Sequence, residues 1–231
     1  MFDILHDYGL ILLVGQYPQG PLGGLAMTLI LAAAALLLSF PLAVLVGIAR
    51  TSPIQSVSWT AAIYTNSIRG LPLLLLVFWS YFAVPMLTGG KVSATFMMLV
   101  ALVVYESAYL GEIVRAGIAA LPRGQQEASR TLGMGYWTTL RKVILPQALY
   151  NMIPSMLNQF VVVVKNTSLA YVIGVDELTN AAYQINGQLL TRPFEVYALL
   201  AITYFIVCFS LSRGVEAVER RITASRRSRP A

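Results

Sequence analysis

Polar side chains that could do chemistry gather in two places along this sequence, each inside a long apolar run. The first group is Tyr105, Glu106, Tyr109 and Glu112, and the second is Asn158, Gln159, Lys165, Asn166, Thr167 and Ser168. Positions 105, 109 and 112 are four and three residues apart, so they share one face of a helix. Polar groups in an apolar helix are costly in hydrocarbon and usually face a cavity or a partner helix. The two groups therefore indicate a polar passage between helices.

The residues for an enzyme's active site are missing from the sequence. Such a site would need a nucleophile, a metal cluster or a clustered acid–base pair, and only scattered Glu and Tyr are present. The one cysteine, Cys208, lies in an apolar run, which excludes a disulfide framework and a multi-cysteine metal site. No G-x-x-x-x-G-K-[ST] phosphate loop occurs. We expect no catalytic residue and no bound metal, and any energy from ATP would have to come from a partner.

The elements that position these groups are expected to be membrane-spanning helices. The 231 residues are 57% hydrophobic and 11% charged, with a mean hydropathy of +0.70, whereas soluble domains usually carry about 25% charged residues. A bilayer core about 30 Å thick needs roughly 20 mostly apolar residues per helix. Five blocks serve as candidate spans: residues 22–49, 59–87, 92–116, 154–175 and 196–212. The predicted fold class is an all-α membrane protein with five transmembrane helices.

The distribution of Lys and Arg orients these spans, because cytoplasmic flanks hold an excess of both residues. If the N-terminus is outside, only Lys91 and Arg192 of the 16 Lys and Arg residues fall on the outer side. Arg69 and Lys165 lie within spans, and the others fall inside. The N-terminus is therefore predicted outside and the C-terminus in the cytoplasm.

The spans also divide the chain into three parts. Residues 1–21 carry Asp3 and Asp7 but no Lys or Arg, so they lack the positive start of a signal peptide. Their apolar side chains favour a short interfacial helix on the outer side. Residues 22–221 form the transmembrane domain, and residues 222–231 form a basic cytoplasmic tail.

A cytoplasmic loop of about 37 residues, 117–153, joins the third and fourth blocks; a loop of this length normally has its own structure or a function. Residues 125–132 have a helical composition, and Met134 between two glycines marks a turn. Residues 136–145 form a second helix that Pro146 is expected to bend or stop. The prediction is a helical hairpin lying against the membrane.

The hairpin sequence resembles a known motif. "EASRTLG", nine further residues and then "VILP" resemble the EAA motif of binding-protein-dependent ABC importer permeases. The positions that match in spacing are Glu127, Ala128, Gly133, Leu145 and Pro146. Ser129 and Val143 depart from the usual Ala and Ile, which are small changes.

Further blocks, "YTNSIRGLPLLLLVFWSYFAVP", "YESAYLGEIVRAGIAALPRGQQEA" and "VVVVKNTSLAYVIGVDEL", resemble polar amino acid permeases of the histidine/glutamine/glutamate group. The first looks closest to glutamate/aspartate importers. The resemblance covers about residues 23–221.

This resemblance implies a type I ABC importer permease fold in the bacterial cytoplasmic (inner) membrane. The loop would be a coupling helix seated in a groove of a cytosolic ATPase dimer, which holds ATP and Mg, so this chain binds no cofactor. Further partners would be a second permease, identical or paralogous, and a periplasmic or extracellular solute-binding protein docking at residues 88–91 and 176–195. No nucleic acid is expected. The coupling residues would be Glu127, Ala128, Ser129, Gly133 and Met134.

The residues expected along the substrate path are Arg69, Glu106, Tyr109, Asn158, Gln159, Lys165, Asn166 and Thr167. The K-N-T-S run resembles a family segment that often reads K-[DN]-T-S, and Asn in place of Asp suits an acidic ligand.

Several alternatives stay open at this point. Glu106 could instead form an ion pair with Lys165 or Arg69, and Arg69 could reach the interface. Asn158 and Thr167 could bond neighbouring helices, while Glu112 and Arg115 fit an anchor for the loop. An ion-coupled secondary transporter is the other function considered, although such carriers usually show an inverted repeat and more spans.

Overall fold

The computed structural model describes residues 2–90 and 92–227, and this part of the chain forms helices and no named β-strand. In chain order they are α1 (Phe2–Val14), α2 (Gly24–Arg50), α3 (Gln55–Arg69), α4 (Leu73–Thr88), α5 (Ala94–Ala119), α6 (Arg123–Thr131), α7 (Tyr136–Thr139), a π-helical turn (Leu140–Ile144), α8 (Leu145–Asn166), a 3₁₀ segment (Thr167–Ile173), α9 (Leu178–Leu189) and α10 (Pro193–Arg227). In the described residues, four helical runs are long and apolar enough to cross a membrane, and the bent pair α3–α4 makes a fifth. The expected all-α architecture is confirmed.

The centre of the fold is a close contact between α2 and α5. Glycines at this contact let the two backbones approach so closely that no space is left for a larger side chain. A Cβ added at Gly47 of α2 would lie 2.4 Å from Val114 Cβ of α5. In the same way, a Cβ at Gly111 of α5 would lie 2.7 Å from Val46 Cγ1. Helices in lipid associate through such close packing because lipid tails are as apolar as leucine and supply no hydrophobic driving force. These glycines therefore fix how α5 lies on α2.

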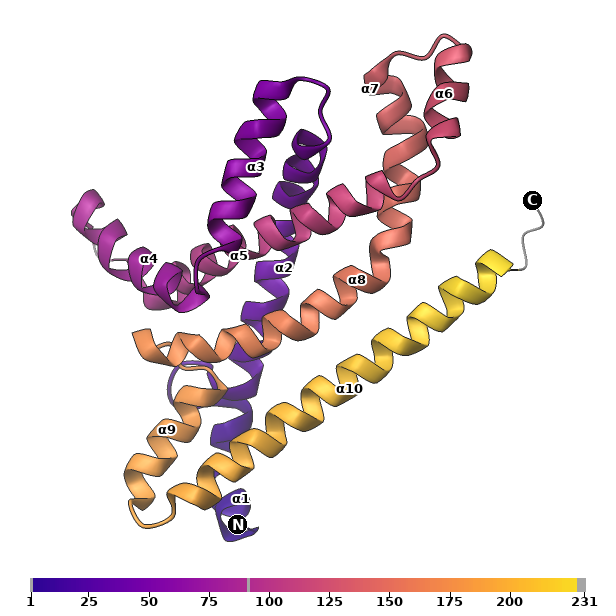
Figure 1. The fold of residues 1–231 in the computed structure, drawn as a ribbon. Coiled ribbons are helices and arrows are strands. Elements are labelled where there is room, and N and C mark those ends of the chain that lie inside the picture. The colour runs from indigo at the N-terminus through magenta and orange to yellow at the C-terminus, as the bar shows by residue number, and fades with distance from the viewer. Residues whose placement is uncertain (1, 91, 228–231) are drawn as a thin grey trace.

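The second predicted block, 59–87, is not one straight span. It is divided into α3 and α4, whose axes differ by 99°. The break lies at Gly70–Pro72: proline disfavours the helical conformation of the preceding residue, Leu71, and has no N–H to continue the ladder. As Figure 1 shows, α4 consequently turns away from α3. Arg69 is the last residue of α3 and so lies at this elbow.

Of the two outcomes expected at Pro146, a bend or a stop, the stop does not occur, because the helix continues from the hairpin into the fourth span as one run, 136–173. The chain accommodates the proline by widening the preceding turn: the Leu145 N–H donates to Leu140 O, five residues back. A proline in a regular helix would clash with the carbonyl four residues earlier. The π-helical turn at Leu140–Ile144 is therefore the local response to Pro146.

The two ends of the molecule are built from different elements (Figure 1). The turn between α6 and α7 lies at one end, and α1, α9 and the start of α10 lie together at the other. There Ile4 and Leu12 of α1 pack with Leu178, Ile185 and Val196. The fifth span is longer than the predicted block 196–212, since α10 continues to Arg227 and takes in part of the predicted tail. Residues 228–231 lie outside the described residues.

Replacement of Gly47 by alanine should destabilise the protein, because the new methyl group would overlap Val114. Overpacking of this kind typically costs about 1–3 kcal/mol. The matched control is Gly214→Ala in α10, where an added Cβ meets nothing within 4 Å. Thermal unfolding in detergent should show a lower melting temperature for Gly47→Ala alone. Equal melting temperatures for both variants would contradict the packing argument.

Candidate functional site

A buried carboxylate, that of Glu106, joins α5 to α8. Its Oε2 accepts a hydrogen bond from Gln159 Nε2 at 2.8 Å, and its Oε1 accepts one from Asn166 Nδ2 at 3.2 Å. The Glu106 side chain is fully buried. A buried carboxylate is tolerated when both oxygens are hydrogen-bonded. Of the predicted path residues, these three are brought into direct contact and act as a clamp between the helices.

Glu106 forms no ion pair with Lys165 or Arg69, which was the alternative that the sequence left open. The reason is helical phase. Residues 159 and 166 are seven apart and face α5, whereas 158 and 165 are also seven apart but lie about 100° further round the helix. Asn158 and Lys165 are accordingly exposed on a neighbouring face of α8.

This exposed face of α8 is polar along much of its length. Ser155, Asn158 and Lys165 all follow helical spacing on it, and all three are exposed. An ammonium or amide facing lipid tails would cost several kcal/mol or more, so such a face requires water or another protein surface. Thr167 differs: it is fully buried and its hydroxyl donates to Val164 O at 2.8 Å. Contact of Thr167 with a solute would therefore need a rearrangement.

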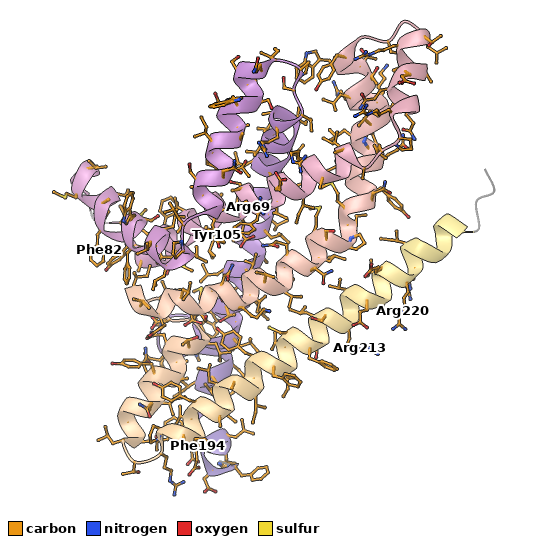
Figure 2. The ribbon with its side chains drawn as sticks, viewed as in Figure 1. Arg69, Phe82, Tyr105, Phe194, Arg213 and Arg220 are labelled. Atoms are coloured by element: carbon orange, nitrogen blue, oxygen red, sulfur yellow. The ribbon has the colours of Figure 1, made fainter. Side chains whose placement is uncertain are left out.

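Arg69 lies at the elbow between α3 and α4 and contacts α5 (Figure 2). Its guanidinium carbon is 5.2 Å from the centre of the Tyr109 ring, a cation–π geometry. The Tyr105 hydroxyl donates to Tyr109 Oη at 3.1 Å, so the two rings stand side by side. Arg69 is thus held against the face of α5 that carries Tyr105 and Tyr109, which we call the tyrosine face, while the Arg69 side chain remains exposed.

Glu112 and Arg115 bind the inner end of α5 to α2. Glu112 Oε1 accepts from Arg115 Nε at 2.7 Å, and its Oε2 accepts from Arg50 Nη2 at 3.4 Å. The three side chains are partly buried, so this ion-pair network is partly desolvated. It holds together the inner ends of α2 and α5, and the cytoplasmic hairpin follows directly after α5. Glu106, in contrast, is the buried carboxylate near the middle of α5.

The hairpin presents the predicted coupling residues at the cytoplasmic end. Glu127 and Ala128 are exposed, whereas Ser129 is buried and its hydroxyl donates to Gln125 O at 2.8 Å. Gly133 adopts φ +76°, where only glycine is unstrained. The turn then closes through the Met134 N–H, which donates to Ser129 O at 3.0 Å.

Two exposed apolar side chains of the hairpin were not among the predicted site residues. Leu132 is 80% exposed and Trp137 is 65% exposed, on either side of the glycine turn. Exposed large apolar groups on a polar hairpin are typical of a contact surface. Their position in an otherwise hydrophilic segment was the available sequence signal.

A second buried carboxylate, that of Glu177, lies at the outer end between the spans. It caps α9 by accepting from the N–H groups of Thr179 and Asn180, each at 2.9 Å, and from the Tyr204 hydroxyl at 3.1 Å. Burial raises the pKa of Glu177 to about 7, although these hydrogen bonds oppose the shift. The Leu178 N–H next to it donates to Thr28 Oγ1 at 3.1 Å. The outer ends of α2, α9 and α10 meet at this point.

Comparison with known proteins identifies the family. Residues 39–224 match the family described as the inner membrane component of binding-protein-dependent transport systems. The chain belongs to this permease family. A probable glutamine ABC transporter permease of Bacillus subtilis is 38% identical over 216 residues, which cover 91% of this chain and 99% of that protein.

Two further similar proteins bear on the transported amino acid and on the fold. A glutamate/aspartate import permease of Escherichia coli O157:H7 is 31% identical over 207 residues, covering 87% of this chain and 92% of that protein. The crystal structure of an amino acid ABC transporter with histidines has a TM-score of 0.83 and 33% identity, covering 96% of this chain and 98% of its own. This protein is therefore a multi-pass permease subunit of an amino acid ABC importer with the type I fold. Its relatives differ in the amino acid they are named for, so they do not single out one substrate.

The burial of Glu177 predicts a specific pH dependence of stability. Its carboxyl has a pKa of about 7 in the folded permease against 4.5 ordinarily, so the folded state holds the proton more tightly. The contribution of the protonated carboxyl is fully present below about pH 4.5 and is lost as pH rises to 7. Glu177→Gln cannot ionise, so relative to wild type it should gain about 1–3 kcal/mol between pH 5 and pH 8. Melting curves at both pH values test this, and an unchanged difference would show that Glu177 is not the titrating group.

Proposed function

We propose that this permease carries a polar amino acid, specifically glutamate or aspartate, across the bacterial cytoplasmic (inner) membrane as part of an ATP-driven importer. The observation that carries the proposal is the exposed polar face of α8 with Lys165, together with Arg69 at the α3–α4 elbow. An acidic amino acid brings two carboxylates and one ammonium, so its passage should offer more cations and donors than carboxylates.

The distribution of charge in the spans supports an acidic substrate. Lys165 and Arg69 are exposed, and the amide of Asn158 lies on the same face as Lys165. The carboxylate of Glu106, in contrast, is buried and has both oxygens occupied by amides of α8. The surface available to a solute is therefore cationic, because the nearby carboxylate of Glu106 is buried and does not face that surface.

The same exposed face supports a second permease as a partner. Polar groups that face lipid are disfavoured, so a neighbouring subunit, identical or paralogous, would enclose the α8 face and complete the passage. A solute-binding protein would deliver the amino acid at the outer end, where α9 and the start of α10 lie.

The energy for transport would come from a pair of cytosolic ATPases that hold ATP and Mg. We assign α6 and its glycine turn to the groove of that ATPase, with Glu127 as the charged contact and Ala128 as the point of close backbone approach. Support comes from the exposure of both residues and from the exposed Leu132 and Trp137 beside the turn. Movement of the ATPases would then switch the spans between inward and outward openings.

The substrate assignment predicts a large effect of Lys165→Met on uptake. Loss of a charged partner in a dehydrated passage costs about 2–5 kcal/mol, so glutamate uptake by the reconstituted complex should fall more than tenfold. Arg220→Met is the control, because that side chain is 76% exposed on the charged part of α10. Labelled glutamate uptake should be inhibited by unlabelled aspartate. Inhibition by glutamine or arginine without inhibition by aspartate would overturn the acidic substrate and leave the amino acid permease intact.

The coupling assignment predicts that Glu127→Lys and Gly133→Val both insert normally yet lose ATP-driven uptake. The first reverses a charge at the ATPase contact, and the second strains a residue at φ +76° by about 1–3 kcal/mol. Matched controls are Glu219→Lys on exposed α10 and Gly135→Val, a neighbouring glycine at φ −67° with free space around it. ATP hydrolysis stimulated by the loaded binding protein is the measurement. Wild-type uptake by the Glu127→Lys complex would refute the role of this glutamate.

A further inference from the structure

A reciprocal pair of amides connects the hairpin directly to the fourth span. Gln125 Nε2 of α6 donates to Gln147 Oε1 of α8 at 3.0 Å, and Gln147 Nε2 donates back to Gln125 Oε1 at 2.9 Å. Gln147 Nε2 also donates to Val143 O, in the π-helical turn, at 2.7 Å. One side chain thus holds α6 and the widened turn together at the first turn of α8.

Few other contacts hold α6 against the rest of the permease. Ser129 is the one buried residue of this helix. Clefts of about 340 Å³ and 90 Å³ border α6 on the side of Thr51 and Ile118, at the inner ends of α2 and α5. Within residues 2–90 and 92–227, no other side-chain hydrogen bond or ion pair joins α6 to another helix. The amide pair is therefore the specific polar attachment of α6.

Two connections join α6 to α8: the chain itself and the Gln125–Gln147 amide pair. The chain is the more flexible of the two. It passes through the glycine turn at Gly133, the short α7 and the π-helical turn. A turn with its hydrogen bond five residues back is rare, and it often occurs at functional positions. Because Gln147 follows Pro146, its bond to Gln125 bypasses both the glycine turn and the widened turn.

We propose that Gln125 and Gln147 are positioning residues that transmit displacement of α6 to α8, and so to the face bearing Asn158 and Lys165. This inference rests on the proposed coupling function of α6. Neither glutamine has to touch substrate or nucleotide in this role. The pair determines instead whether α8 follows α6 when the ATPases move.

Charge-pair variants test this link without removing the side chains. Gln147→Lys keeps a donor for Val143 O, and it is combined either with Gln125→Glu, which attracts it, or with Gln125→Lys, which repels it. The attractive double variant should retain uptake within about twofold of wild type. The repulsive one should lower the uptake obtained per ATP hydrolysed by roughly three- to tenfold, the range expected when one weak polar link is lost. Gln55→Lys, exposed at the start of α3 on the same side, controls for added charge.

The measurements separate the link from the coupling function itself. Membrane insertion, melting temperature and copurification with the ATPase should be equal in the two double variants, because an exposed amide pair contributes little to stability. Equal transport per ATP in the attractive and repulsive variants would overturn the link, even if Glu127→Lys abolishes stimulation. If the wild-type complex itself shows no ATP-dependent uptake, the coupling function fails and the link with it.

Discussion

The contact between α2 and α5 is the constraint on which the rest of this permease depends. The two helices approach so closely that a single added methyl group at Gly47 or Gly111 would overlap a valine of the other helix. Arg50 and Glu112 then tie their inner ends together. This rigid pair holds the tyrosine face and Glu106, so that α8 and the hairpin are arranged around a fixed reference. The hairpin helix α6 is attached through hydrogen bonds and turns, whereas α8 also packs directly on α5 through the buried cluster of Val114, Ile118, Ala148 and Met152.

Hydropathy predicted the spans well because the cost of burying polar backbone in lipid depends mainly on length and composition. It could not predict the 99° break between α3 and α4, since Gly70 and Pro72 hardly change the average over a window. The glycine turn of the hairpin was predictable from Gly133. The continuation of the helix through Pro146 was not, because widening the turn to absorb a proline depends on neighbouring packing by Leu140 and Ile144.

The candidate path shows the same division between composition and geometry. Sequence alone correctly gathered Glu106, Gln159 and Asn166 as polar residues inside spans. It could not decide the partner of Glu106, because formal charge allowed Lys165 or Arg69, while the rotation of α8 selected the neighbouring amides. A difference of one residue in helical phase therefore separates a structural clamp from an exposed cation. The Gln125–Gln147 pair was not predicted either, since two glutamines 22 residues apart carry no distinctive pattern.

The chemical nature of that glutamine pair has a physiological consequence. Two amides carry no net charge, so their attraction is neither screened by dissolved ions nor titrated in the cytoplasm. A carboxylate–ammonium pair at the same exposed position would weaken with salt, because the screening length is about 8 Å at physiological ionic strength. A neutral link would therefore keep the amount of amino acid imported per ATP hydrolysed independent of the salt concentration on that side of the membrane.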